Sequence, residues 1–192
     1  MSTSEIVRNM FMLGTGSRSE ANEVTVEAQL VDRIRSGDRE AFGEIYRMFA
    51  PLVHGIVLAR VPHDEVQDIV QDVFLTAYHQ LHSLRDKSAV GAWVATIARN
   101  RAAEFYRQSR PTEELTEELH GRTRPHAEAQ EILSAIRSLP DSYRETLVLR
   151  LVEGMSGSEI AERTGLRPDS VRVNLHRGME LLREKLGIGG KK

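Results

Sequence analysis

Apolar residues recur at helical spacing along most of this chain, and this pattern constrains its fold more than any other feature. Between Pro62 and Pro111 there is no proline, and the apolar stripe there consists of Val66, Ile69, Val70, Val73, Phe74, Ala77 and Leu81. A similar stripe lies upstream, in Ile34, Phe42, Ile45, Tyr46 and Phe49. No alternating stretch is long enough to predict a strand. The sequence therefore predicts an all-α protein.

A polar segment divides the apolar pattern into two blocks. Residues 111–128 hold five Glu, two Pro and one Gly with few bulky apolar residues, a composition typical of a linker. We therefore expect two small helical domains, 27–110 and 129–187, joined by a flexible acidic linker. A loose N-terminal extension at 1–26 and a short tail at 188–192 complete the predicted organisation.

Composition narrows the class of protein further. The chain has no cysteine and a net charge of −2, so a disulfide framework, thiolate metal sites and a uniformly basic nucleic-acid coat are excluded. A reducing compartment fits the lack of cysteine, and we expect a cytoplasmic protein. We expect no membrane insertion, because no apolar run in the sequence is long enough to span a bilayer.

Residues 156–186 carry the strongest local signal, that of a helix-turn-helix. Ser156 and Glu159 have the spacing of a capping box, which starts a helix. Gly165 stands where a sharp turn between helices needs a positive φ, and Pro168 suits the first position of the next helix. In the second helix the apolar stripe comprises Val171, Leu175, Met179, Leu182 and Leu186. The C-terminal domain is therefore predicted to contain a helix-turn-helix.

The opposite face of this second helix is polar and basic. Residues 163–185 contain six basic and three acidic residues. The positions predicted to be exposed are Ser170, Arg172, Val173, Asn174, His176 and Arg177. Such a helix can enter the DNA major groove, where Arg reads guanine and Asn reads adenine. A helical hairpin with a solvated charged face is the simpler alternative.

Two helical segments of the first domain carry opposite charge. Residues 61–84 contain no Lys or Arg, and Glu65, Asp68 and Asp72 share one helix face. That face repels phosphate and suits either a basic protein partner or water alone. Residues 99–110 contain four Arg, one Glu and two aromatic residues, a composition that suits distorted or single-stranded DNA. The single Trp93 is assigned to packing.

Several blocks, in this order, resemble the extracytoplasmic-function group of bacterial RNA polymerase sigma factors. They are DEVQDIVQDVFLTAYHQL (64–81), WVATIARNRAAEFYRQSR (93–110), SLPDSYRETLVLRLVEGMSGSEIAERTGL (138–166) and VRVNLHRGMELLREKL (171–186). The resemblance covers about residues 27–110 and 129–187. It implies an alternative sigma factor that binds core RNA polymerase, recognises the minus-thirty-five and minus-ten promoter elements and promotes promoter melting.

The resemblance assigns expected roles to individual positions. Contact with the clamp helices of the largest polymerase subunit is expected at Glu65, Asp68, Gln71 and Asp72. Contact with minus-ten DNA is expected at Asp86, Lys87, Ser88, Ala89, Asn100, Arg101 and Arg107, the first four lining a pocket for a flipped base. Contact with minus-thirty-five DNA is expected at Ser170, Arg172, Val173, Asn174, His176 and Arg177.

The same resemblance implies the remaining partners. The polymerase flap region is a further expected contact, and an anti-sigma protein is an expected regulator. No enzymatic activity, cofactor or metal is expected, because catalysis belongs to the polymerase. The acidic segment Glu113–Glu118 could instead mask the basic helices in the free chain.

The sequence alone leaves other functions possible. A helix-turn-helix repressor or activator explains 156–186 but gives the acidic and basic segments of the first domain no role. A metal hydrolase could use His79 and His82 with Asp68 or Asp72, although no third ligand has a recognisable spacing. A protein-interaction module is the third alternative, if the basic helices do not touch DNA.

Overall fold

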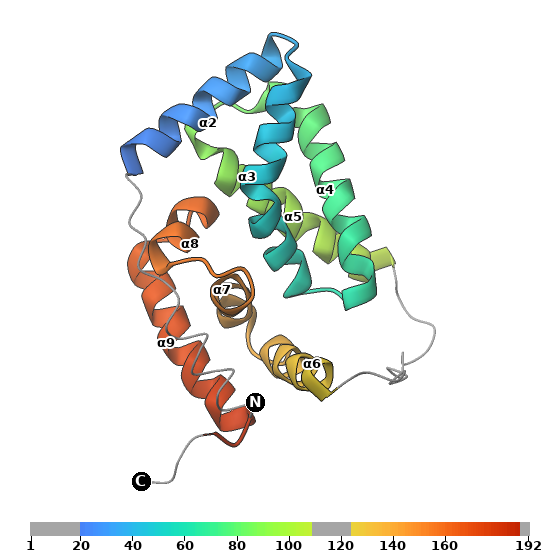
Figure 1. The fold of residues 1–192 in the computed structure, drawn as a ribbon, viewed down its shortest axis with the longest axis vertical. Coiled ribbons are helices and arrows are strands. Elements are labelled where there is room, and N and C mark those ends of the chain that lie inside the picture. The colour runs from blue at the N-terminus through green and yellow to red at the C-terminus, as the bar shows by residue number, and fades with distance from the viewer. Residues whose placement is uncertain (1–19, 109–123, 189–192) are drawn as a thin grey trace.

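The structure, a computed structural model, describes residues 20–108 and 124–188, and within these ranges it consists of helices and turns without strands. The N-terminal module contains α2 (Glu20–Arg35), α3 (Arg39–Leu58), α4 (Val66–Gln80) and α5 (Val90–Gln108), with 3₁₀ turns η1 (His63–Glu65), η2 (Leu81–Ser83) and η3 (Lys87–Ala89). The C-terminal module contains α6 (Arg124–Arg137), α7 (Asp141–Leu151), α8 (Gly157–Thr164) and α9 (Pro168–Lys185) (Figure 1). The all-α prediction is confirmed.

The core of the N-terminal module is formed by the predicted apolar stripes. Helix α3 begins after Asp38, whose carboxylate accepts from the backbone N–H groups of Glu40 and Ala41 at 3.0 and 3.3 Å. From α3, Ile45 and Phe49 are fully buried. The buried residues of α4 are Val66, Ile69, Val70, Val73, Phe74 and Ala77. Burial of one face of α4 leaves its opposite face available for contacts.

The helix-turn-helix has the predicted local geometry. The Ser156 hydroxyl accepts from Glu159 N, and the Glu159 carboxylate accepts from Ser156 N at 2.8 Å, so the capping box is complete. Gly165 ends α8 with a φ of 72°, and Pro168 is the first residue of α9. Val171, Met179 and Leu182 are buried, whereas Leu175 and Leu186 are partly buried against the core. Local sequence signals therefore determine both helices and the turn between them.

Gly165 meets two constraints at once, and its replacement should destabilise the protein. A Cβ there would lie 3.1 Å from the Ala92 Cβ, and the left-handed backbone would also strain any other residue. We expect Gly165→Ala to lower the free energy of unfolding by about 1–2 kcal/mol in urea titrations. The matched control is Gly43→Ala inside α3, where an added Cβ meets nothing within 4 Å. That control should not destabilise, and equal stability of the two variants would contradict the assigned role of Gly165.

Two helices begin earlier than the predicted domain boundaries. Helix α2 begins at Glu20, inside the predicted extension 1–26, and α6 begins at Arg124, inside the predicted linker 111–128. Residues 20–26 have only two bulky apolar side chains, Val24 and Val26, and residues 124–128 have none, so neither start carries an apolar stripe. Apolar periodicity therefore did not locate the start of either helix. Residues 1–19, the acidic segment Glu113–Glu118 and the end of the tail lie outside the described residues.

The two modules pack directly against each other. Helix α7 lies against α3, and α8 lies against α5 (Figure 1). Gly55 of α3 allows α7 to approach α3 closely, because a Cβ at this position would lie 2.7 Å from Leu149 Cδ2. The Arg163 side chain donates to the Met48 carbonyl at 2.9 Å, and His54 and Glu153 pair at 2.6 Å across the same boundary. Within the described ranges, no helix is both long and apolar enough to cross a membrane.

Candidate polymerase and promoter-DNA interfaces

The predicted acidic face lies on the outer side of α4. Asp68, Gln71 and Asp72 are exposed, and Glu65 is partly exposed at the preceding turn. The C-terminal module packs on α3 and α5, and Figure 1 shows α4 on the opposite side of the molecule from α8 and α9. The acidic face therefore stays accessible while the two modules are in contact.

Apolar side chains continue the acidic face, and the sequence analysis did not predict them as contact residues. Leu75 is 59% exposed and Tyr78 is 41% exposed, each within two turns of Asp72 on the same helix. Tyr46 of α3 is also exposed, and its ring packs 4.5 Å from that of Phe74. Exposed large apolar residues beside charges are typical of a protein-binding surface. Their helical spacing after Asp72 was the available signal.

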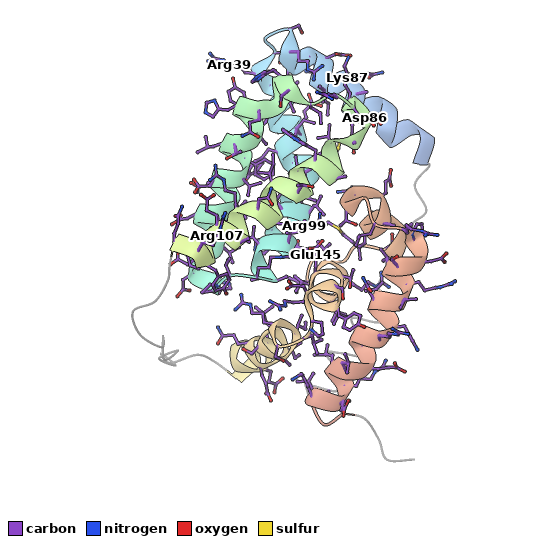
Figure 2. All side chains as sticks on the ribbon, turned by 180° about the vertical axis from the view of Figure 1, so that it is seen from behind. Arg39, Asp86, Lys87, Arg99, Arg107 and Glu145 are labelled. Atoms are coloured by element: carbon purple, nitrogen blue, oxygen red, sulfur yellow. The ribbon has the colours of Figure 1, made fainter. Side chains whose placement is uncertain are left out.

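The predicted minus-ten loop is held in one conformation by its own side chains and by α2. Asp86 caps η3 by accepting from the Ser88 hydroxyl at 2.6 Å and from Ser88 N at 3.0 Å. These two hydrogen bonds lower the pKa of the Asp86 carboxyl below its ordinary value. Lys87 pairs with Asp32 of α2, and Figure 2 shows Asp86 and Lys87 next to that helix. The loop is therefore preorganised, with Asp86 and Ser88 exposed.

Arg35 of α2 supports this loop from behind and should control its mobility. Its Nη2 donates to the carbonyls of Leu81, at 3.3 Å, and of Leu84. A hydrogen bond from a charged donor contributes about 1.5 kcal/mol. We therefore expect Arg35→Gln to accelerate amide hydrogen exchange of residues 84–90 by roughly tenfold.

The matched control for this prediction lies on the same helix. Arg33 pairs instead with Asp38 and Glu44 at 2.8 and 2.9 Å, away from the loop. Arg33→Gln should therefore leave exchange at 84–90 unchanged. Unaltered exchange in the Arg35→Gln variant would contradict the supporting role.

The other predicted minus-ten residues lie further along α5. Asn100 is ten residues beyond Val90, which corresponds to about 15 Å along a helix. Asn100 and Arg107 are exposed. Arg101 is engaged within the module, because it donates to Thr76 of α4 at 2.8 Å and to Glu104 at 2.9 Å. The structure therefore places these residues along one helix and does not gather them with the loop into a single cluster.

The predicted minus-thirty-five residues share the exposed side of α9. Ser170, Arg172, Val173, His176 and Arg177 are exposed, and Asn174 is partly exposed. Arg172 forms an ion pair with Asp169 at 3.3 Å on the surface, which restrains it only weakly. Gly178 lies on the buried side, where a Cβ would come within 3.1 Å of Leu147. The glycine therefore permits close packing of α9 on α7.

A buried ion-pair cluster joins the two modules, and the sequence analysis did not predict it. Glu145 of α7 pairs with Arg60 at 2.5 Å and with Arg99 of α5 at 2.7 Å. Burial alone would raise the pKa of the Glu145 carboxyl, but the hydrogen bonds and charges of both arginines outweigh it and lower the pKa. Glu145 therefore stays ionised at neutral pH. A charge two residues before the apolar run 147–149 was the signal available in the sequence.

The residues of the metal-hydrolase alternative do not form a metal centre with other ligands. His79 and His82 are both exposed. In the part of the chain that the structure describes, no group of three or more His, Cys, Asp or Glu side chains could hold a metal ion. The acidic side chains nearby are those of the exposed α4 face.

Comparison with known proteins gives the class of the chain. The family model for sigma-70 region 2 matches residues 45–112, and the model for sigma-70 region 4 matches residues 129–182. The RNA polymerase sigma factor CarQ of Myxococcus xanthus is 30% identical over 166 residues, which cover 82% of this chain and 95% of that protein. The chain belongs to the sigma-70 family of RNA polymerase sigma factors.

Further relatives narrow the group within that family. The ECF RNA polymerase sigma-E factor of Haemophilus influenzae is 28% identical over 185 residues, covering 86% of this chain and 97% of that protein. Among solved structures, CnrH in complex with the cytosolic domain of CnrY is 25% identical, with a TM-score of 0.63, covering 86% of this chain and 99% of that one. The sigma factor RpoE of Bartonella quintana, solved with the anti-sigma factor NepR, shares the fold at 20% identity, with a TM-score of 0.54 and coverage of 78% and 98%.

These findings confirm the resemblance identified in the sequence. The chain is an alternative sigma factor of the extracytoplasmic-function group, and it acts in promoter recognition and transcription initiation. Sigma factors are regulatory transcription factors. The findings therefore favour a sigma factor over the repressor and hydrolase alternatives.

Proposed function

We propose that three surfaces of this sigma factor divide the work of initiation between them. The acidic face of α4 (Glu65, Asp68, Gln71 and Asp72) binds the clamp helices of the largest polymerase subunit. The observation that carries this assignment is its charge: residues 61–84 contain no Lys or Arg, and the acidic side chains point to solvent. Leu75 and Tyr78 add apolar area to the same contact.

The second surface is the η3 loop with the exposed side of α5. In this proposal Asp86, Lys87, Ser88 and Ala89 line a pocket for a base flipped out of the minus-ten element. Extracting a base costs a few kcal/mol, and a preorganised pocket offsets that cost. The hydrogen bonds of Asp86 and Arg35 support this role, because they fix the loop before DNA arrives. Asn100, Arg101 and Arg107 contact the adjacent DNA.

The third surface is the exposed side of α9, which reads the minus-thirty-five element in the major groove. Arg172, Val173, His176 and Arg177 face the bases, and Ser170 and Asn174 complete the contact. The polymerase flap region is a further proposed partner of the chain. The linker sets the effective concentration of this second DNA contact once the first has formed.

The proposal assigns catalysis to the polymerase and gives the chain no catalytic group or cofactor. Its partners, core polymerase and promoter DNA, place its work in the cytoplasm. An anti-sigma protein is the proposed regulatory partner. The solved relatives support this partner, since CnrH was solved in complex with the cytosolic domain of CnrY and RpoE with the anti-sigma factor NepR.

Footprinting with and without core polymerase tests this division of work. Each module alone makes few phosphate contacts, so the free chain should bind DNA weakly and with steep salt dependence. Holoenzyme should protect both promoter elements in one footprint. Strong protection of a palindrome by the free chain, unchanged when polymerase is added, would contradict the proposal.

A further inference from the structure

At the contact between the two modules, two arginines are arranged to hold an anion. We propose that Arg60 and Arg99 form a binding site for a phosphate group of the DNA backbone, which Glu145 occupies while the two modules are packed together. The proposal rests on the proposed contact of α5 with promoter DNA. It extends that contact to Arg60, and to Arg99, which the sequence analysis named only as one of the four Arg in the basic segment 99–110.

In this site the guanidinium group of Arg99 binds both oxygens of the Glu145 carboxylate. Arg99 Nε donates to Glu145 Oε2 at 3.1 Å, and Arg99 Nη2 donates to Oε1 at 2.7 Å. Arg60 Nη2 donates to Oε2 at 2.5 Å from the other side. Paired N–H groups of one guanidinium fit a phosphate as well as a carboxylate. The site is therefore suited to either anion.

Other contacts hold Arg60 in place. Arg60 Nη1 donates to the Ile56 carbonyl at 3.0 Å, and the Arg60 carbonyl accepts from the Tyr106 hydroxyl at 2.7 Å. The side chains of Arg60 and Arg99 are only 17% and 30% exposed, compared with 6% for Glu145. All the residues that shape the site, except Glu145, belong to the N-terminal module. Arg60 is therefore expected to keep its position when α7 leaves.

The surroundings favour nucleic acid over another anion. Tyr106 is 54% exposed beside Arg60, and it lies seven residues after Arg99, on the same face of α5. An aromatic ring next to a pair of arginines offers a base a stacking surface while its phosphate is bound. The exposed Asn100 follows Arg99 directly. Figure 2 shows Arg99 beside Glu145 and Arg107 further along the same helix.

Glu145 fills the site with a carboxylate from the same chain. DNA can bind the two arginines only after α7 has moved away. The observed affinity of the free chain for DNA is therefore lower than that of the open state, in proportion to the fraction of molecules that are open. Gly55 allows this contact to be tested without changing any charge. A Cβ at 55 would lie 2.7 Å from Leu149 Cδ2 and 2.9 Å from Glu153 Cγ, both on the C-terminal module. Gly55→Ala should therefore force these side chains to shift and weaken the contact between the modules, and it should also favour α3.

The test measures binding of the free full-length chain to a short fluorescein-labelled DNA duplex of arbitrary sequence, over a range of salt. The probe needs no promoter sequence, because phosphate binding does not depend on sequence. We expect Glu145→Gln and Gly55→Ala each to raise the affinity roughly tenfold. Adding Arg99→Gln to either variant should remove the gain and reduce the salt slope by about 0.9, the loss of one phosphate contact.

A matched control uses the same helix. Asp141→Asn also removes a negative charge from α7, but Asp141 pairs only with Arg144 of its own helix, at 3.1 Å, among the contacts the structure describes. This control should bind DNA like the wild type. Circular dichroism and thermal melting verify that each variant is folded. If Glu145→Gln does not fold, Gly55→Ala still tests the proposal.

Two results would overturn the proposal. One is a DNA affinity that rises in neither Glu145→Gln nor Gly55→Ala. The other is a gain that persists, with the same salt slope, after Arg99→Gln is added. Transcription by wild-type holoenzyme tests the proposed function separately. If no promoter-specific transcription were seen, the proposed promoter contact would be rejected, but the duplex titration would still report whether Arg99 binds phosphate.

Discussion

Replacing Asp68 and Asp72 with lysine will prevent the chain from forming holoenzyme. Both side chains are exposed on α4, whereas the residues that pack this helix lie on its other face, so the fold should be retained. Like charges brought together in an interface cost several kcal/mol. We expect the double variant Asp68→Lys/Asp72→Lys to bind core polymerase on the order of a hundredfold more weakly, measured by fluorescence anisotropy of the labelled chain.

The matched control for this loss is an acidic pair on the other module. Glu128 and Glu131 lie on α6, Glu131 exposed and Glu128 partly exposed, away from the proposed clamp contact. Glu128→Lys/Glu131→Lys changes the net charge by the same amount. It should bind core polymerase like the wild type. Equal losses in both double variants would show that net charge, and not the α4 face, determines binding.

Removing the two arginines from the proposed reading face of α9 will abolish recognition of the minus-thirty-five element. Arg172 and Arg177 are both exposed on this helix. A side chain paired with a base contributes about 1–3 kcal/mol of discrimination. We expect Arg172→Gln/Arg177→Gln to lower promoter-directed transcription on the order of a hundredfold and to make it insensitive to changes in the minus-thirty-five sequence.

The sequence dependence separates base reading from general attraction to DNA. Lys185 is exposed near the end of the same helix, and its replacement by Gln should weaken binding to all promoters equally. The double arginine variant should instead bind wild-type and altered minus-thirty-five sequences with similar affinity. If it still discriminated between them as the wild type does, α9 would not be the reader.

The helix-turn-helix could be predicted almost completely from the sequence, because each of its signals is local. The capping box spans four residues, the turn needs one glycine with a positive φ, and Pro168 fixes the first turn of α9. The acidic face was predictable for the same reason, since residues spaced along one helix share a face whatever packs against it. Their roles with polymerase and DNA remain predictions.

The contact between the modules could not be predicted, because it joins residues far apart in the chain. Glu145 reads as an ordinary surface charge, although its partners Arg60 and Arg99 lie 85 and 46 positions away. Gly55 gave the clearest hint, since a glycine inside an apolar helix often marks a close approach. The sequence could not show which helix approached it. The starts of α2 and α6 were missed because their first residues include too few bulky apolar side chains to form a periodic pattern.

The opposite charges of α4 and of the DNA-facing helices form the basis of this account. It holds that the chain supplies promoter choice and that polymerase supplies catalysis. Mapping transcript starts, with core polymerase and genomic templates in the presence and absence of the purified chain, tests this most directly. The account predicts a set of start sites that appears only with the chain and shares one pair of upstream elements. Identical start sites with and without the chain would contradict it.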